Sequence, residues 1–184
     1  MSTRVVLVNE DGQPTGTTEK LRAHTEGRRH RALSVFVFDT EGRLLLQQRT
    51  PEKYHSGGLW SNTCCSHPRP DELPEEAARR RLREEMGFAC SLTPLFHFTY
   101  HASVGDGLVE YEYDHVFVGR VTTADIRPDP TEVADWAWTA PTALRANLQA
   151  APHQYTVWFR RLLGPVLADD RSPVSAQASA NHSR

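Results

Sequence analysis

Short apolar runs separated by turn residues dominate the first fifty positions of the chain. Residues 5–9, 33–39 and 43–48 combine β-branched, aromatic or leucine side chains in runs too short for a helix, which predicts strands. The polar turn at residues 39–42 lies between the second and third runs and predicts a hairpin. The same pattern predicts three later strands, at residues 95–102, 111–121 and 132–139.

Residues 74–86 have the spacing of an amphipathic helix. Ala78, Leu82 and Met86 repeat every four positions, a proline suits the first turn, and Gly87 suits the C-terminal stop. Because paired strands come first and strands interleaved with helices follow, we expect an α/β fold with a mixed sheet. Two further helices are predicted over residues 141–149 and 154–167.

The rest of the chain divides into a long loop and a polar tail. Residues 51–70 are irregular and rich in Gly, Ser, Asn, Pro and His, and a loop of this length in a compact domain is usually functional. The last fourteen residues, from Arg171, are small, polar and without periodicity, which predicts disorder. We therefore expect one domain over residues 1–168 and a disordered tail within residues 169–184.

Composition and charge narrow the class of protein. The length of 184 residues fits one domain, and 21 Lys and Arg against 23 Asp and Glu give a net charge of −2, which argues against a nucleic-acid or membrane-surface binder. Three cysteines, two of them adjacent, argue against a secreted disulfide framework. The N-terminus has no signal-peptide core, and no apolar run approaches the ~20 residues of a membrane span. We expect a cytoplasmic monomer or weak dimer, with neither nucleic acid nor membrane as a partner.

Three histidines and two glutamates have the chemistry of a metal site. His24 and His30 lie on either side of a polar segment just before a strand, and His67 lies on the long loop. Glu110 and Glu112 are two positions apart in a strand, so both point to one face. Neutral imidazole and carboxylate groups suit zinc, manganese and similar ions. The sequence alone does not bring the five together, and dispersed surface side chains are the alternative.

Cys65 is the candidate for proton transfer. It lies between Asn62-Thr63 and Ser66-His67 on the long loop. A nearby cation or metal would lower its pKa and make it an acid or base near neutrality. The alternative, which is the commoner fate of a free cysteine, is a small buried apolar side chain.

Cations near the long loop and on the 74–86 helix could bind phosphate. Arg81 and Glu85 lie one turn apart on that helix, where an arginine can bind phosphate oxygens and a carboxylate can hold Mg²⁺. Lys20, Arg49 and Lys53 could join Arg81 in neutralising a diphosphate. The alternative is a solvated helix face with ion pairs, and ordinary surface charge elsewhere.

Residues 66–88 resemble the Nudix box, a pattern found in hydrolases that bind Mg²⁺ on helix carboxylates and cleave diphosphates. Two positions depart from it, because Ser66 replaces a glycine and Arg81 replaces a glutamate. The exchange of a carboxylate for an arginine removes a metal ligand and adds an anion binder, which predicts a site that holds a diphosphate more readily than it cleaves it. The positions that fit the box are Glu72, Arg80, Leu82, Glu84, Glu85, Gly87 and Phe88.

Beyond the box, the chain is similar to the type I isopentenyl diphosphate isomerase family. The resemblance rests on the sequences NTCCSHP at residues 62–68, AHT at 23–25 and VEYE at 109–112, together with His30, and extends from about residue 5 to about residue 165. It implies a Nudix-like α/β/α sandwich with extra N-terminal strands. It also implies the isomerisation of isopentenyl diphosphate to dimethylallyl diphosphate. Cys-Ser-His replaces the Cys-Gly-His of some relatives, which affects only the loop backbone.

The same resemblance implies a role for each candidate residue. Cys65 and Glu112 are implied as the catalytic pair, with Tyr100 assisting and Trp158 beside the reacting carbons. Glu85 and the backbone of Cys65 are implied to hold a Mg²⁺ ion that bridges to the diphosphate. One Zn²⁺ or Mn²⁺ ion is implied on His24, His30, His67, Glu110 and Glu112. The implied diphosphate-binding cations are Lys20, Arg49, Lys53 and Arg81.

Two other functions compete with the isomerase. A Nudix hydrolase of nucleoside or other diphosphates would release phosphate and would not need Cys65, and Arg81 in a carboxylate position argues against it. A metal- or ligand-binding module without activity would bind metal tightly and turn nothing over. The combination of the Cys-x-His loop, the aromatic residues and the helix residues argues against the second alternative.

Overall fold

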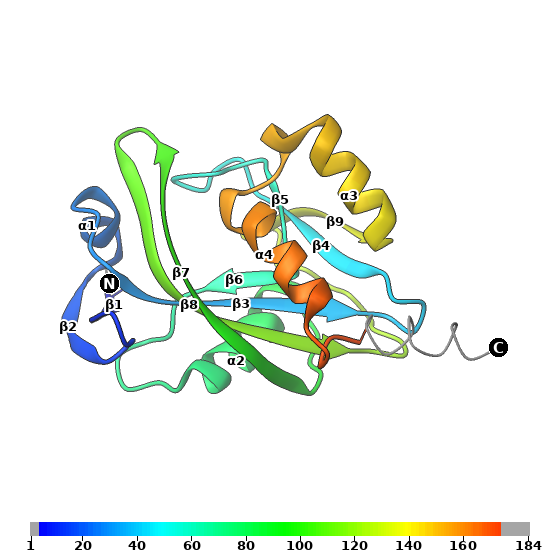
Figure 1. The fold of residues 1–184 in the computed structure, drawn as a ribbon, viewed down its shortest axis with the longest axis horizontal. Helices are drawn as coiled ribbons and strands as arrows, with labels where there is room; N and C mark the ends of the chain where they lie inside the picture. The colour runs from blue at the N-terminus through cyan, green and yellow to red at the C-terminus, as the bar shows by residue number, and fades with distance from the viewer. Residues whose placement is uncertain (1–3, 174–184) are drawn as a thin grey trace.

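The computed structural model describes residues 4–173 of the chain. Within this range nine strands form one mixed sheet, with helices on both of its faces (Figure 1). The predicted α/β sandwich with additional N-terminal strands is therefore confirmed. The strands are β1 (Arg4–Val8), β2 (Pro14–Glu19), β3 (His30–Phe38), β4 (Leu44–Arg49), β5 (Trp60–Ser61), β6 (Cys64–Ser66), β7 (Leu92–Gly105), β8 (Leu108–Arg120) and β9 (Val133–Thr139). The helices are α1 (Lys20–Thr25), α2 (Pro74–Met86), α3 (Pro141–Ala150), the 3₁₀ turn η1 (Pro152–Gln154) and α4 (Val157–Ala168).

Strand β3 is the centre of the sheet. It pairs in parallel with β8 along its whole length, starting with His30 opposite Glu112. On its other side it pairs antiparallel with β6, where Ser34 lies opposite Cys65. Strand β8 continues the sheet outward by pairing antiparallel with β7, which places Tyr100 opposite Glu112. The register of β3 therefore brings the predicted metal and catalytic residues onto adjacent strands.

The alternation of side chains along β3 produces two apolar cores. Phe36 and Phe38 point to one face of the sheet, where they meet residues such as Phe159. Helices α3 and α4 lie on this face (Figure 1). Val35 and Val37 point to the opposite face, which α2 covers. A strand buried on both faces is typical of a sheet between two helical layers. The site described below lies where this buried strand begins.

Helix α2 has the bounds that the sequence predicts. Its apolar stripe packs on the sheet, with Leu82 and Met86 fully buried. The helix ends at Gly87, whose φ of 76° is left-handed and whose N–H donates to the carbonyl of Arg83. A side chain at position 87 would also collide with the backbone carbonyl of Arg127. These two constraints explain why a glycine stops the helix there.

Three parts of the fold differ from the sequence-based expectation. The predicted irregular loop at residues 51–70 contains the short strands β5 and β6, which pair with β4 and β3. Strand β2 and helix α1 have no counterpart in the prediction, because β2 is largely exposed and α1 has only six residues, too few for a periodic signal. Strands β7 and β8 begin earlier or end later than predicted, since their pairing continues to the tip of a long hairpin.

The described end of the chain lies against β7. The guanidinium of Arg171 binds the carboxylate of Asp169 at 2.8 Å and donates to the backbone carbonyls of Pro94 and Leu95. The rest of the predicted tail, residues 174–184, lies outside the described residues, and the domain boundary at residue 168 stays a prediction. Within residues 4–173, no helix combines the length and the apolar character needed to cross a bilayer.

The packing of α2 predicts a strong difference between two leucines. Replacing Leu82, which is fully buried, with Ala should lower the free energy of unfolding by about 2–5 kcal/mol because it leaves a cavity under the helix. Replacing Leu73, which is 60% exposed just before the helix, with Ala should change it by about 0.5 kcal/mol or less. Urea denaturation measures both, and equal losses would contradict the described packing.

Candidate active site and metal centre

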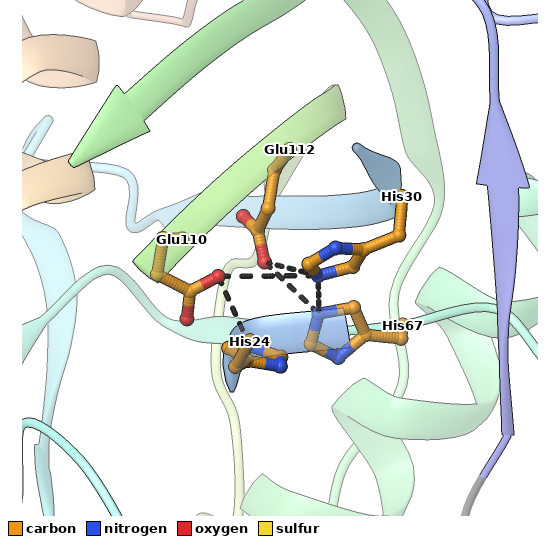
Figure 2. A group of neighbouring side chains, drawn as sticks. All are labelled: His24, His30, His67, Glu110 and Glu112. Carbon is orange, nitrogen blue, oxygen red and sulfur yellow. Dashed lines mark hydrogen bonds and ion pairs between the residues drawn. The ribbon is translucent and has the colours of Figure 1, made fainter. Parts of the chain in front are cut away.

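The five predicted metal ligands converge at one point, as Figure 2 shows. Helix α1 carries His24, β3 begins at His30, the segment after β6 carries His67, and β8 carries Glu110 and Glu112. One ligand atom from each residue lies within 4.8 Å of all the others. Four of the five are buried and His67 is partly buried. The predicted grouping is therefore present, and the alternative of dispersed surface side chains is wrong.

Backbone carbonyls fix the orientation of two of the imidazole rings. Nδ1 of His24 lies 2.7 Å from the carbonyl oxygen of Lys20, and Nδ1 of His30 lies 2.8 Å from that of Arg28. Because a carbonyl can only accept, each Nδ1 carries the hydrogen and donates it. In the neutral ring each Nε2 then carries no hydrogen, as in most metal-binding histidines, and that of His24 also lies 3.3 Å from the hydroxyl of Tyr54.

The close spacing of these nitrogen and oxygen ligand atoms makes the cluster fit a divalent cation. Nε2 of His30 and Nε2 of His67 are only 3.2 Å apart, and the latter lies 2.9 Å from Oε1 of Glu112. Among residues 4–173, the buried Oε2 of Glu110 has no hydrogen-bond partner, although Nε2 of His24 lies 3.2 Å away. Burial also lowers the pKa of His67 well below its usual value, and neutral imidazole is the form that binds metal.

Glu112 uses its two carboxylate oxygens differently. Oε1 faces the imidazoles of His30 and His67, while Oε2 accepts a hydrogen bond of 2.6 Å from the hydroxyl of Tyr100. Burial, together with the charge of Glu110, raises the pKa of Glu112 to about 7. Burial likewise raises the pKa of Tyr100 well above its usual value, so Tyr100 remains a hydrogen-bond donor. Glu112 thus belongs to the His/Glu cluster and also lines the adjacent cavity.

A small inner cavity of about 30 Å³ separates Glu112 from Cys65 and Trp158, all of which line it. Burial raises the pKa of Cys65 to about 11, and Arg49, whose Nη1 lies 3.6 Å from Sγ, acts in the opposite direction. The indole N–H of Trp158 donates to the hydroxyl of Ser61 at 3.0 Å, which fixes the ring as a wall of this cavity. The predicted catalytic residues therefore line one small cavity.

A larger outer cavity of about 410 Å³ adjoins the inner one. Lys20, Arg49, Cys65 and His67 line both, so the two cavities share a wall. The outer cavity is strongly cationic, which suits an anion of several charges. All four cations predicted to bind a diphosphate line it: Lys20, Arg49, Lys53 and Arg81.

Glu85 lies beside this outer cavity and is 3% exposed. Its Oε1 accepts a hydrogen bond of 2.7 Å from Arg81, and its Oε2 accepts one of 3.0 Å from the side-chain amide of Gln47. Glu84 is exposed and lies on a solvated helix face, as the alternative expected, whereas Glu85 is buried. Glu132 pairs with Arg81 at 3.3 Å and also with Lys53, so two of the cations already have a carboxylate partner.

Several residues of this site were not predicted from the sequence, among them Gln47, Glu132 and His55. Gln47 and Glu132 contact the Glu85–Arg81 pair from other strands and loops, and no motif marked them. His55 is 6% exposed on the loop between β4 and β5, and its Nε2 lies 2.9 Å from Oε1 of Glu110. The length of this loop was the only available signal, because residues in irregular segments have no periodicity that indicates where they point.

Comparison with known proteins identifies the family. The NUDIX domain family matches residues 28–160. The isopentenyl-diphosphate Delta-isomerase of Halorhodospira halophila is 54% identical over 161 residues, which cover 86% of this chain and 92% of that protein. Isopentenyl-diphosphate Delta-isomerase 1 of Aromatoleum aromaticum is 49% identical over 178 residues, or 95% of this chain and 100% of that protein. This chain belongs to the isopentenyl-diphosphate Delta-isomerase family.

The fold of this isomerase-family chain has counterparts among solved structures. The crystal structure of DR0079 from Deinococcus radiodurans superposes with a TM-score of 0.73, covering 88% of this chain and 98% of that one. At 23% identity it supports the fold alone. The hydrolase alternative is not favoured, because relatives that are about half identical over most of the chain are named isomerases.

The converging ligand atoms predict how a single substitution changes metal binding. Replacing His30 with Ala should weaken the binding of Mn²⁺ at least about 10-fold, because it removes one donor of the cluster. The same change at His153, which is exposed on η1, should leave binding unchanged. Competition with a chromophoric chelator measures both affinities. Equal affinities of wild type and His30→Ala would show that the cluster does not bind the ion.

Proposed function

We propose that this chain converts isopentenyl diphosphate to dimethylallyl diphosphate with Cys65 and Glu112 as its proton-transfer pair. The observation that carries the proposal is the inner cavity, which these two residues line together with Trp158 and beside the metal cluster. Membership of the isopentenyl-diphosphate Delta-isomerase family supports the substrate and the reaction. The chain thus takes a small isoprenoid diphosphate as its partner and serves isoprenoid biosynthesis.

The reaction makes three demands that these residues meet. An unactivated alkene is a poor base, so a strong acid must protonate its terminal carbon. A base must remove a proton from the carbon on the other side of the resulting tertiary cation. The cation must also be kept from water and stabilised, which the face of Trp158 can do with a cation–π attraction of roughly 2 kcal/mol or more in a desolvated site.

Glu112 is the proposed proton donor and Cys65, as a thiolate, the proposed base. The hydroxyl of Tyr100 donates to Oε2 of Glu112 at 2.6 Å, so it orients the carboxylate beside the cavity that both residues line. The guanidinium of Arg49 beside Sγ favours the thiolate of Cys65 against the effect of burial. The two residues exchange roles when the reaction runs in reverse. Each positioned acid or base contributes roughly 10²–10⁴-fold to the rate.

The proposed cofactors are two divalent ions with different residues. The three histidines, Glu110 and Glu112 hold one Zn²⁺ or Mn²⁺ ion, and Glu85 with the backbone of Cys65 holds a Mg²⁺ ion beside the diphosphate. When bound, these ions fix the carboxylate of Glu112 and neutralise phosphate charge. Five protein ligands leave little open coordination, so the His/Glu cluster serves mainly to orient Glu112.

The outer cavity is the proposed diphosphate site. The four predicted cations supply much of the charge, and Glu132 pairs with two of them, Lys53 and Arg81, so the substrate must compete with this carboxylate for both. Arg81 also donates a hydrogen bond to Oε1 of Glu85, so this carboxylate of the Nudix box is paired with a cation. We further propose that the enzyme is a cytoplasmic monomer or weak dimer.

The first test uses the acid lability of the product, because an allylic diphosphate is hydrolysed by mild acid and isopentenyl diphosphate is not. Cys65→Ser and Glu112→Gln should each lower kcat by about 10²–10⁴-fold and change KM little. Cys90→Ser, which alters a thiol that lines neither the inner nor the outer cavity, should keep the wild-type rate. A Cys65→Ser or Glu112→Gln variant with most of its kcat would refute the assigned pair.

The contact between Arg49 and Cys65 predicts different kinetics for two cations. Arg49→Ala should raise KM and also lower kcat, because Arg49 lines the diphosphate cavity and lies against Sγ. Lys53→Ala should raise KM with a smaller change in kcat, since its partner is Glu132. Steady-state kinetics at saturating Mg²⁺ separates the two effects. An unchanged KM in both variants would place the diphosphate elsewhere.

A further inference from the structure

The proton-transfer mechanism leaves one buried histidine of the site unused. His55 is held in the loop between β4 and β5, where its backbone carbonyl accepts a hydrogen bond of 3.3 Å from Arg49. Its ring stacks on that of His24, with centres 5.4 Å apart, and meets the ring of Trp158 edge-on at 6.1 Å. These contacts hold the ring between the histidines of the cluster and Trp158, and His55 itself lines the inner cavity.

The hydrogen bonds of His55 determine which of its nitrogens donates. Nε2 lies 2.9 Å from Oε1 of Glu110, and Nδ1 lies 3.3 Å from the hydroxyl of Ser56. A carboxylate only accepts, whereas a serine hydroxyl can donate. The neutral ring therefore carries its hydrogen on Nε2 and donates it to Glu110, while Nδ1 accepts from Ser56.

This hydrogen bond gives the two carboxylate oxygens of Glu110 different partners. Oε1 is occupied by His55, which leaves Oε2 facing Nε2 of His24 at 3.2 Å and Nε2 of His30 at 4.0 Å. A carboxylate without such a partner can rotate about its terminal torsion, which has broad minima. Glu110 would then present its oxygen to the cluster only part of the time.

We propose that His55 is a positioning residue of the metal centre, whose Nε2–H locks Glu110 with Oε2 turned toward the histidine cluster. The inference rests on the proposed function, because it requires an ion on the His/Glu cluster. It adds a residue that lies outside the five ligands and outside the pair that transfers protons. Groups that hold a ligating carboxylate typically change metal affinity about 10–100-fold when they are removed.

The test compares two replacements of the same ring. His55→Phe keeps the aromatic contacts with His24 and Trp158 and removes the donor, so it should weaken the binding of Mn²⁺ alone about 10–100-fold. His55→Gln places an amide N–H near the position of Nε2 and should recover most of the affinity. His153→Phe is the matched control on the surface and should bind as the wild type does.

Metal affinity is measured on the full chain by competition with a chelator, and kinetics follow on the same samples. For His55→Phe, kcat at limiting Mn²⁺ should fall and saturating Mn²⁺ should restore it. If circular dichroism shows that His55→Phe is unfolded, His55→Leu replaces it. This variant also removes the N–H donor and keeps an apolar side chain in the same place.

Each outcome bears on a separate claim. A wild-type chain that binds no Mn²⁺ or Zn²⁺ at the cluster would overturn the proposed metal site itself. A wild type that binds, with a donor-free variant that binds within about threefold of it, would overturn the role of His55 alone. Loss of affinity that is equal in His55→Gln and His55→Phe would also overturn it, because an N–H donor near the position of Nε2 would then fail to restore binding.

Discussion

The parallel pairing of β3 with β8 is the constraint on which the rest of the site depends. It places His30 beside Glu112, and it sets Glu110 and Glu112 on the same face of β8. Side chains alternate along a strand, so a slip of one residue would turn both carboxylates to the opposite face and break the metal cluster. The same pairing fixes the alternation of β3 between its two apolar cores, so packing on both faces specifies the register.

Burial shifts the pKa values of the site and also makes the His/Glu cluster energetically unfavourable without a bound cation. Three imidazoles and two carboxylates are gathered in one largely buried cluster, and their ligand atoms lie within 4.8 Å of one another. Unpaired buried polar groups are unfavourable, so the cluster is arranged for a positive charge that the chain does not itself supply. The cations of the outer cavity are arranged for a negatively charged group. A chain with a net charge of only −2 thus has a carboxylate-rich cluster next to a cationic cavity.

Regular patterns were predictable, and contacts that irregular segments create were not. The 74–86 helix was predicted with its observed bounds because a periodic stripe, a proline and a glycine agree there. Most site residues came from the family resemblance, since spacing alone did not bring His24 or His67 to the strands. His55 could not be found, because the direction of a loop side chain depends on tertiary packing. Strand β2 and helix α1 were missed since each is too short or too exposed to have a clear pattern.

Proton NMR of the enzyme with Mg²⁺ and isopentenyl diphosphate in D₂O tests the central claim most directly. The account predicts that the signals of the two dimethylallyl methyl groups grow, that the methyl formed from the terminal alkene carbon carries deuterium, and that no free phosphate is released. Free phosphate with an unmoved double bond would contradict it, and so would formation of the product without any deuterium from the solvent. Either result would mean that Cys65 and Glu112 do not carry out the proton exchange assigned to them.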